Sequence, residues 1–307
     1  MSWGKIFTAL FIFPGMLYAV PMAWLMLWLE RKLRARMQGR IGPPFYQPFF
    51  DFVKLMAKKP ILRSRADAIL MTGLPLLAVS AGLVALALLP VFPGSRGFAG
   101  DIVLLVAFIE VPSLCAVLAG FASRSIFGQV GATREAVLSI TYNLPFLTAV
   151  VALAYSAHSL ALADIAAAPA TWVRAPAVTT ILLCLPVKLR INPFSVSNAE
   201  QEIYSGPATE FGGSQLAMWE LAHGLEWVVL TGLAVCLGLP RTGAPVIDIA
   251  LFAGLSLVLV VLLSFLAAGT ARLKVAQAAR FYWRWGMGLA LAALILAMLP
   301  GIERFIR

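Results

Sequence analysis

Long runs of apolar residues constrain this chain more than any other feature of its sequence. Stretches such as 101–122 and 246–268 are almost wholly apolar over about 20 residues, the length that a helix needs to cross the hydrocarbon core of a bilayer. Of the 307 residues, 61% are hydrophobic and 12% are charged, whereas soluble domains carry about a quarter charged residues. The runs lack the alternation of a membrane β-barrel, so we expect an all-α integral membrane protein.

Eight apolar runs predict eight transmembrane helices in a single polytopic domain that covers residues 1–307. The predicted helices cover residues 5–29, 67–92, 101–122, 136–157, 176–191, 212–239, 246–268 and 283–302. The Ala-rich stretch 158–175 is not expected to be a ninth helix across the membrane. It contains Asp164, Pro169 and Arg174, which favour an excursion at the membrane interface.

The distribution of basic residues predicts how these helices are oriented. Cytoplasmic loops of membrane proteins are rich in Lys and Arg. In the eight-helix arrangement, most of the 24 Lys and Arg residues fall in loops on one side. We therefore expect these loops to face the cytoplasm of a prokaryotic cell and both termini to lie outside. The net charge of +10 then reflects orientation and contact with anionic lipid headgroups, and no nucleic-acid partner is expected.

The first predicted cytoplasmic loop contains a candidate amphipathic helix at about residues 47–59. It follows the helix-breaking sequence Gly42-Pro43-Pro44, and Pro48 suits a first helical turn. One apolar face recurs at helical spacing and consists of Phe49, Phe52, Val53 and Met56. We expect an interfacial helix that serves as a lipid anchor, or as one wall of a crevice or docking surface. The candidate docking or crevice residues are Arg36, Arg40, Gln47, Phe49, Asp51 and Lys54.

A predicted cytoplasmic loop at about residues 190–211 concentrates acidic residues. Glu200, Glu202 and Glu210 lie close together there, between two predicted helices. Carboxylates that repel one another and resist desolvation have raised pKa values, so we expect this cluster to exchange protons near neutral pH. The alternative is that each glutamate pairs with an Arg or Lys of a neighbouring loop.

Ionisable residues also fall inside the predicted helices, where they must face a protein interior or a water-filled cavity. Glu110 has no basic residue in its own helix, which favours a proton relay. Glu220, His223 and Glu226 share one sector of a helix. The alternatives are ion pairs with another helix for the glutamates and a packing role for His223. The candidates for proton or ion coupling are Glu110, Glu135, Glu200, Glu202, Glu210, Glu220, His223 and Glu226.

The chain shows no signature of a redox centre of its own. Its three cysteines, Cys115, Cys184 and Cys236, lie in separate apolar runs and form no CxxC pair. We interpret them as small buried hydrophobic residues. There is no Walker A loop, no GxGxxG and no haem-spaced pair among the two histidines. We expect no catalytic residue, metal or cofactor within this chain.

Two stretches of the sequence resemble one known family. "ERKLRARMQGRIGP…QPFFDFVKLMAKK" resembles the first cytoplasmic loop, and "NPF…AEQEIYSGPATEFGG" the acidic loop, of subunit 1 of NADH:quinone oxidoreductase, respiratory complex I. The membrane subunits of energy-converting nickel–iron hydrogenases and formate hydrogenlyases share both stretches. The resemblance implies eight transmembrane helices plus the amphipathic helix, in a subunit that carries the hydrophilic redox arm. In complex I, this subunit also walls the quinone chamber.

The stretches "SGPATEFGG" and "GATRE" are more similar to the hydrogenase branch than to complex I. The resemblance thus implies a non-redox anchor and coupling subunit of an energy-converting nickel–iron hydrogenase that links the arm's reaction to H⁺ or Na⁺ translocation. The implied partners are hydrogenase-like large and small subunits, a ferredoxin-like iron–sulfur subunit, antiporter-like membrane subunits and lipids. The iron–sulfur clusters and the nickel–iron centre would lie in those partners.

Several positions depart from the family's acidic pattern. Ser195, Asn198 and Asn143 stand where acidic residues are usual, and His223 stands where complex I has Glu. These changes argue against carrying over the quinone-linked proton path of complex I. Two other functions stay open: a quinone-chamber subunit of complex I, with quinone as the ligand, and an ion transporter or anchor without redox partners.

Overall fold

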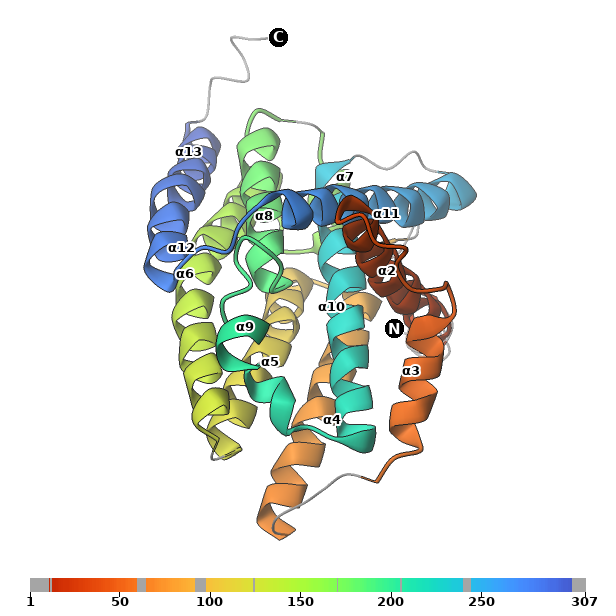
Figure 1. Cartoon of the computed structure of the whole chain (residues 1–307). Coiled ribbons are helices and arrows are strands. Elements are labelled where there is room, and N and C mark those ends of the chain that lie inside the picture. Colours follow the sequence, from red (N-terminus) through yellow and green to blue (C-terminus); the bar gives the residue numbers. More distant parts are fainter. Residues whose placement is uncertain are drawn as a thin grey trace.

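A computed structural model of the chain describes residues 11, 13–59, 65–91, 98–123, 125–169, 171–204, 206–239 and 244–299. Within these ranges the regular secondary structure is helical, with no strand (Figure 1). The all-α fold predicted from the apolar runs is therefore confirmed for this part of the chain.

Six helices in the described ranges are long and apolar enough to cross a membrane. They are α4 (Arg65–Leu88), α5 (Asp101–Ala122), α6 (Ile126–Ala157), α10 (Gly213–Gly238), α11 (Pro245–Gly269) and a last helix that combines α12 (Val275–Phe281), the π-helical turn η3 (Tyr282–Gly286) and α13 (Met287–Met298). They correspond to six of the eight predicted spans, which is consistent with an integral membrane protein.

The first and fifth predicted spans are also helical, but shorter in the described residues. Helix α2 covers Met16–Met37, and residues 5–10 of the first predicted span lie outside the described part. Helix α8 (Arg174–Lys188) has 15 residues. At 1.5 Å per residue it rises about 22 Å, less than the roughly 30 Å of a hydrocarbon core. The count of eight and the side on which the termini lie therefore stay predictions.

Two short helices occupy the segments predicted to lie outside the main spans. Helix α3 (Gln47–Met56) is the predicted amphipathic helix, and it ends at Met56 rather than at residue 59. Helix α7 (Leu162–Ala167) lies in the Ala-rich stretch and, with six residues, is too short to be a ninth span. Buried Arg174 donates to the carbonyls of Ile165 and Ala168 at 2.9 and 2.8 Å, so it caps the end of α7.

Helix α6 begins at Ile126, whereas the sequence predicts a start at residue 136. Arg134 and Glu135, expected in or beside a loop, are therefore helical residues. The sequence argument failed here because residues 126–135 contain two glycines and two charges, so they do not form an apolar run. Tertiary packing stabilises this segment as helix instead.

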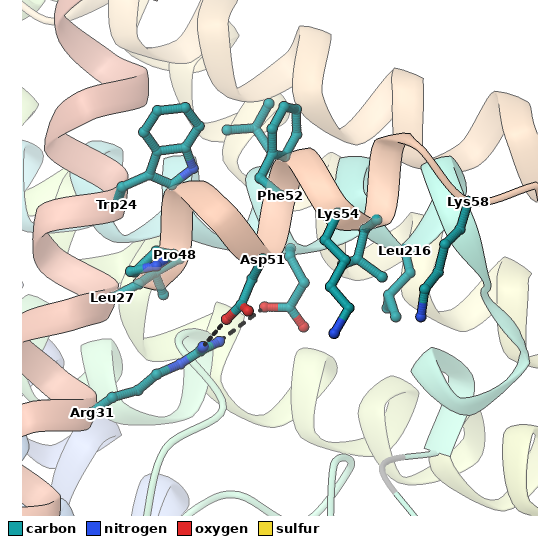
Figure 2. Close-up of a pocket in the computed structure, with 12 residues that line it drawn as sticks. Trp24, Leu27, Arg31, Pro48, Asp51, Phe52, Lys54, Lys58 and Leu216 are labelled. Atoms are coloured by element: carbon teal, nitrogen blue, oxygen red, sulfur yellow. Dashed lines mark hydrogen bonds and ion pairs between the residues drawn. The ribbon is translucent and has the colours of Figure 1, made fainter. Parts of the chain in front are cut away.

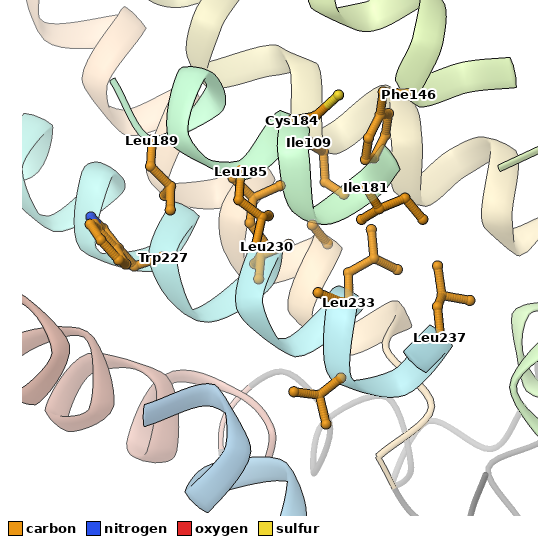
Figure 3. Close-up of a cluster of buried hydrophobic side chains, with 14 of the residues drawn as sticks. Ile109, Phe146, Ile181, Cys184, Leu185, Leu189, Trp227, Leu230, Leu233 and Leu237 are labelled. Carbon is orange, nitrogen blue, oxygen red and sulfur yellow. The ribbon is translucent and has the colours of Figure 1, made fainter. Parts of the chain in front are cut away.

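Helix α10 is the central helix of the bundle (Figure 1). In its most apolar window 78% of the residues are buried, against 28% for α11 and 22% for the last helix. The core around α10 is built from large side chains such as Trp227 and Leu230, with Phe146 of α6 and Ile181 and Leu185 of α8 (Figure 3). Because α11 and the last helix are mostly exposed and apolar, their outer faces suit contact with lipid or other membrane subunits.

The end of α2 positions the first loop. Gly39 has a φ of +72°, and the N–H of Arg40 donates to the carbonyl of Ala35 at 2.8 Å, as in a Schellman motif. The chain then folds back, because Trp28 Nε1 and Lys32 Nζ each donate to the carbonyl of Pro43 at 3.2 Å. This arrangement leaves the side chains of Arg36 and Arg40 exposed.

Residues 190–211, which we call the acidic segment, form a packed structure rather than an open loop. The segment contains α9 (Glu200–Ile203) and the 3₁₀ turn η2 (Gly206–Glu210), and Ile203 and Pro207 are buried. It lies against Gly131 of α6, where an added Cβ would meet the Cδ of Pro207 at 2.8 Å and the carbonyl oxygen of Ser197 at 3.1 Å. Glycine at 131 is therefore what allows the acidic segment to approach α6.

We predict that Gly131→Ala displaces the acidic segment. The added methyl group overlaps backbone and proline atoms, so we expect the free energy of unfolding to fall by about 1–3 kcal/mol, even though alanine favours a helix by about 1 kcal/mol. Hydrogen exchange should speed up in residues 196–211. Gly254→Ala in α11 is the matched control, because nothing lies within 4 Å of its added Cβ. Equal exchange in the two variants would contradict the prediction.

Candidate functional site

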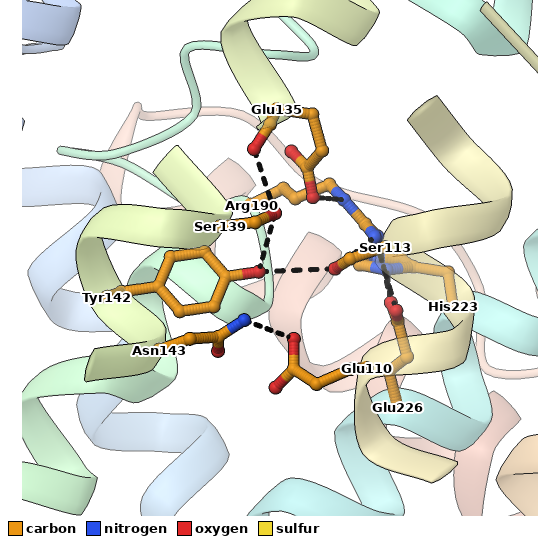
Figure 4. A network of polar contacts seen from close by, with 9 residues as sticks. All are labelled: Glu110, Ser113, Glu135, Ser139, Tyr142, Asn143, Arg190, His223 and Glu226. Atoms are coloured by element: carbon orange, nitrogen blue, oxygen red, sulfur yellow. Dashed lines mark hydrogen bonds and ion pairs between the residues drawn. The ribbon is translucent and has the colours of Figure 1, made fainter. Parts of the chain in front are cut away.

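Arg190 lies at the centre of a buried ionic cluster between α5, α6 and α10 (Figure 4). Its Nε donates to Glu135 Oε1 at 3.1 Å, and its Nη1 and Nη2 donate to the two carboxylate oxygens of Glu226 at 2.9 and 3.2 Å. The side chains are 6%, 3% and 7% exposed, respectively. A guanidinium does not lose its proton in proteins, so one permanent cation is shared by two buried carboxylates.

The backbone of Arg190 adopts an uncommon conformation. Its φ is +54°, in the left-handed region that residues other than glycine rarely occupy. Such a conformation costs on the order of 1–3 kcal/mol and persists only where the surroundings determine it. Here the guanidinium bonds and the burial of the side chain hold it. Arg190 therefore links the end of α8 to the rest of the acidic segment in a strained backbone conformation.

A second ion pair joins Glu110 of α5 to Lys188 of α8. Lys188 also donates to Asn143 Oδ1 at 2.9 Å, and Asn143 Nδ2 donates to Glu110 Oε2 at 2.7 Å. The Lys188 Nζ lies 4.7 and 4.4 Å from the ring centroids of Tyr142 and Phe146, so the ammonium also makes cation–π contacts. Glu110 has no basic residue in its own helix, but α8 supplies one, Lys188.

Hydroxyl groups connect the two ion pairs. The Tyr142 hydroxyl lies 3.2 Å from Ser113 Oγ and 3.4 Å from Ser139 Oγ, and Arg190 Nη2 donates to Ser113 Oγ at 3.4 Å. The ring of the same tyrosine faces Lys188. Hydrogen bonds, ion pairs and this one cation–π contact together make a contiguous set, which we call the buried network: Glu110, Ser113, Glu135, Ser139, Tyr142, Asn143, Lys188, Arg190, His223 and Glu226.

The hydrogen bonds of His223 determine which of its ring nitrogens carries a proton. The indole N–H of Trp227 can only donate, and it lies 3.3 Å from His223 Nε2, so Nε2 accepts. The proton must then sit on Nδ1, which donates to Glu226 Oε2 at 3.1 Å. His223 is therefore neutral in this arrangement. A second proton on Nε2 would face the indole N–H and break that bond.

Two of the small cavities that border the buried network, each of about 10 Å³, have Arg190 in their walls. One lies between Glu135, Arg190 and residues of the acidic segment, including Asn198. The other is lined by Arg190, His223 and Glu226. A volume of this order corresponds to a single water position, and both cavities have polar walls. The first cavity connects the buried charges to the acidic segment.

Glu202, at the surface of the acidic segment, pairs with Arg134 of α6 at 2.6 Å. The hydrogen bond from Arg134 lowers the pKa of the Glu202 carboxyl below its usual value. The expectation of a raised pKa is therefore wrong for this residue. It failed because α6 extends far enough to bring Arg134 alongside, as the ion-pair alternative supposes. Glu202 stays ionised at neutral pH.

The remaining acidic candidates lie in different places. Glu210 is half-buried at the end of η2 and forms no ion pair with any residue in the described ranges. Glu200 begins α9, but its side chain lies outside what the structure describes. Glu220 pairs with Arg31 of α2 at 3.4 Å, and Arg31 also lies 3.7 Å from Asp51. Glu220 is therefore separate from the buried network.

Several docking candidates lie at an open crevice of about 300 Å³ between α2, α3 and α10 (Figure 2). Asp51 and Lys54 line it, and Gln47 donates to Asp51 Oδ1 at 2.7 Å. Phe49 instead packs edge-on against Trp24, with 5.2 Å between ring centroids, and is 45% exposed. The structure thus brings Asp51 and Lys54 together with Glu220 and Arg31, a grouping that the sequence did not reveal.

Lys188 and Arg190 are the charged residues of the buried network that the sequence analysis missed, together with the hydroxyl residues Ser113, Ser139 and Tyr142. Both basic residues lie at the end of the predicted span 176–191 and were counted among the basic residues of the loop that follows, yet they are 4% and 9% exposed. A signal was present, since Glu110, Asn143 and Lys188 each lie two residues from a proline inside a helix: Pro112, Pro145 and Pro186. Pro and polar residues within membrane helices commonly accompany functional sites.

The cysteines make no metal site in the residues that the structure covers. Cys115 and Cys184 are buried and Cys236 is half-buried. No group of three or more His, Cys, Asp or Glu in the described ranges is placed to hold a metal ion.

Comparison with known proteins agrees with the resemblance of the two loops. The family model described as NADH dehydrogenase matches residues 9–298. Hydrogenase-4 component C of Escherichia coli (strain K12) is 32% identical over 280 residues, which are 87% of this chain and 88% of that protein. A chain of the membrane-bound sulfane sulfur reductase, an archaeal respiratory membrane complex, superposes with a TM-score of 0.86 at 27% identity, over 96% of this chain and 99% of its own length. This chain therefore belongs to the NADH dehydrogenase family of membrane subunits, which is the family of subunit 1 of complex I.

Proposed function

We propose that this chain is the non-redox anchor and coupling subunit of a complex-I-like, energy-converting nickel–iron hydrogenase. It docks the hydrophilic electron-transfer arm and links the arm's reaction to H⁺ or Na⁺ translocation. The observation that carries the proposal is the buried network beneath the acidic segment. The similarity to Hydrogenase-4 component C over most of both chains supports the hydrogenase branch.

The arm would dock on the cytoplasmic loops. Arg36 and Arg40 are exposed beside the Schellman turn, and Glu202 is 51% exposed on the acidic segment. Charges of both signs on neighbouring surfaces favour one orientation of a partner. The expected partners are hydrogenase-like large and small subunits and a ferredoxin-like iron–sulfur subunit, which would hold the iron–sulfur clusters and the nickel–iron centre. Antiporter-like membrane subunits would continue the ion path.

The charge balance of the buried network favours the uptake of a cation. Lys188 and Glu110 neutralise each other, whereas Arg190 faces both Glu135 and Glu226 beside a neutral His223. With these groups ionised, the network carries one excess negative charge in a poorly hydrated interior. One proton, at His223 or a carboxylate, or one Na⁺ would offset it.

Arg190 would link the arm to this charge. It continues directly into the acidic segment, so a displacement of that segment when the arm is reduced would move the guanidinium between Glu135 and Glu226. Each carboxylate that loses its share of the cation becomes easier to protonate. The hydroxyls of Ser113 and Tyr142 would carry the change toward Lys188 and Glu110. In this mechanism, a local electrostatic change acts on one side chain, Arg190, that has two arrangements between Glu135 and Glu226.

A quinone-chamber subunit of complex I is the second candidate, and the crevice between α2, α3 and α10 favours it. Its volume of about 300 Å³ lies at the lower end of the range for small-molecule sites. Co-purified quinone and inhibition by quinone-site ligands would support this reading. An ion transporter without redox partners has less support, because both relatives are named as parts of multi-subunit redox systems.

The direct test is to purify the intact complex from its membranes through a tag on this chain. The proposal expects nickel in the complex and hydrogen evolution from a reduced donor. A nickel-free complex would overturn the hydrogenase assignment. Reduction of sulfane sulfur by such a complex would instead place the chain with its archaeal relative, whose complex has that activity in its name.

We predict that Glu110→Gln uncouples the complex. The amide oxygen can still accept from Lys188, but the amide carries no charge and cannot take up a proton, so the proton-transfer step should slow by roughly 100-fold. Hydrogen evolution in detergent should persist, while ion uptake per hydrogen evolved in sealed vesicles should collapse. Asp164→Asn, at an exposed position of α7, is the control carboxylate and should pump normally. Pumping by the Glu110 variant at the normal ratio would refute its role.

Loss of the partner cation should destabilise the chain. Lys188→Met leaves the half-buried carboxylate of Glu110 without its cation, and breaking a buried ion pair by removing one partner typically costs about 3–5 kcal/mol. We expect this variant to unfold at lower temperature and the double variant Lys188→Met, Glu110→Gln to recover much of the loss. Thermal unfolding of the purified complexes measures both. Without recovery in the double variant, the ion pair would not be the source of the effect.

We predict that the surface ion pair between Arg134 and Glu202 supports docking of the arm to the same extent at every pH near neutrality. The pKa of Glu202 is lower in the folded chain than the usual carboxyl pKa. The stabilisation that the ion pair with Arg134 contributes is therefore complete above the usual carboxyl pKa, and it is lost only as pH falls through the lowered pKa. Arg134→Gln and Glu202→Gln should therefore reduce retention of the arm on washed membranes by the same factor at pH 6, 7 and 8. If Glu202 exchanged protons near neutral pH, the defect of the two variants would instead diminish toward pH 6.

A further inference from the structure

The crevice between α2, α3 and α10 contains cations that no carboxylate neutralises. Arg31 is engaged by Asp51 and Glu220, at 3.7 and 3.4 Å. Lys54 of α3 and Lys58, two residues beyond the end of that helix, also line the crevice and form no ion pair within the part of the chain that the structure covers. Figure 2 shows Lys54 extending from α3 and Lys58 from the segment just after it, in the same direction, on either side of Leu216. They present two ammonium groups to one volume.

The other wall of the crevice is apolar and aromatic. Trp24 and Leu27 of α2 and Phe52 of α3 line it, away from the lysines (Figure 2). The outer face of α3 continues this apolar surface, since Phe50 and Val53 are 55% and 46% exposed. Exposed apolar faces of this kind on an interfacial helix lie against acyl chains. The crevice thus joins a cationic end to a surface suited to hydrocarbon.

We propose that this crevice binds an anionic glycerophospholipid, with its phosphate between Lys54 and Lys58 and its acyl chains along Trp24, Phe52 and the outer face of α3. The crevice of about 300 Å³ is large enough for a headgroup and glycerol but not for two chains, which stay on the open apolar surface. Soluble phosphate would leave the apolar wall of the crevice uncovered. A lipid is therefore the occupant that matches both the cationic end and the apolar wall.

Charge complementarity favours an anionic lipid over a zwitterionic one or a neutral quinone. The ionisable lining residues are three cations, Arg31, Lys54 and Lys58, and two carboxylates, Asp51 and Glu220, so the site carries one excess positive charge. An anionic headgroup offsets this charge, whereas a quinone offers no charge to the lysines. Basic residues near the membrane surface contribute roughly 1 kcal/mol each to binding of anionic lipid, which is about a fivefold preference. The inference does not depend on the redox reaction of the complex.

The test uses the purified complex in nanodiscs that contain phosphatidylglycerol and phosphatidylcholine in equal amounts. Native mass spectrometry of the released subunits measures which lipid stays bound to this chain. We expect phosphatidylglycerol to be retained preferentially, and the preference to fall roughly 25-fold in the double variant Lys54→Gln, Lys58→Gln, about fivefold for each lysine. Lys59→Gln is the control, because this exposed lysine follows α3 but does not line the crevice. A second variant, Leu216→Trp, should displace the lipid by filling the crevice while both lysines remain.

Three results would overturn the proposal. One is an unchanged preference in the double variant. Another is an equal loss in Lys59→Gln, which would mean that general surface charge attracts the lipid. The last is displacement of the lipid by added menaquinone with an affinity that the lysine substitutions do not alter, which would make the crevice a quinone site. Co-purification of the other subunits with each variant confirms that the complex is assembled.

Discussion

The pairing of one buried guanidinium with two buried carboxylates holds the centre of this structure together. Arg190 comes from the chain just after α8, whereas Glu135 belongs to α6 and Glu226 to α10, so their contacts tie three separate parts of the bundle. Removing one member would leave an uncompensated charge in the interior, which typically costs about 3–5 kcal/mol. The left-handed backbone at residue 190 depends on this arrangement.

The same arrangement explains how a surface segment can affect the membrane interior. The acidic segment begins at Arg190 and packs on α6 through Gly131, close to the turn of α6 that carries Arg134 and Glu135. One of these neighbours pairs with Glu202 at the surface and the other with Arg190 in the interior. A change at the surface pair therefore has a short mechanical and electrostatic route to the buried network.

Much of the fold could be predicted, because long apolar runs and turn residues report on local structure. The helical class, α5 at 101–122, the position of α3 and the family all followed from the sequence and agree with the structure. The start of α6 was wrong by about three turns, since glycines and charges in residues 126–135 hide a helix that only packing stabilises. The acidic cluster was found, but not the cation that lowers the pKa of Glu202.

By itself, the sequence determined that the chain is a bundle of apolar helices with carboxylates where water is scarce, because hydrophobic length and charge are properties of each segment alone. Only the tertiary structure decided which cation serves which carboxylate. Lys188 and Arg190 looked like loop residues that set orientation, and they are the partners of Glu110, Glu135 and Glu226. Pairing energies depend on distances between helices remote in sequence, and no local pattern records those distances.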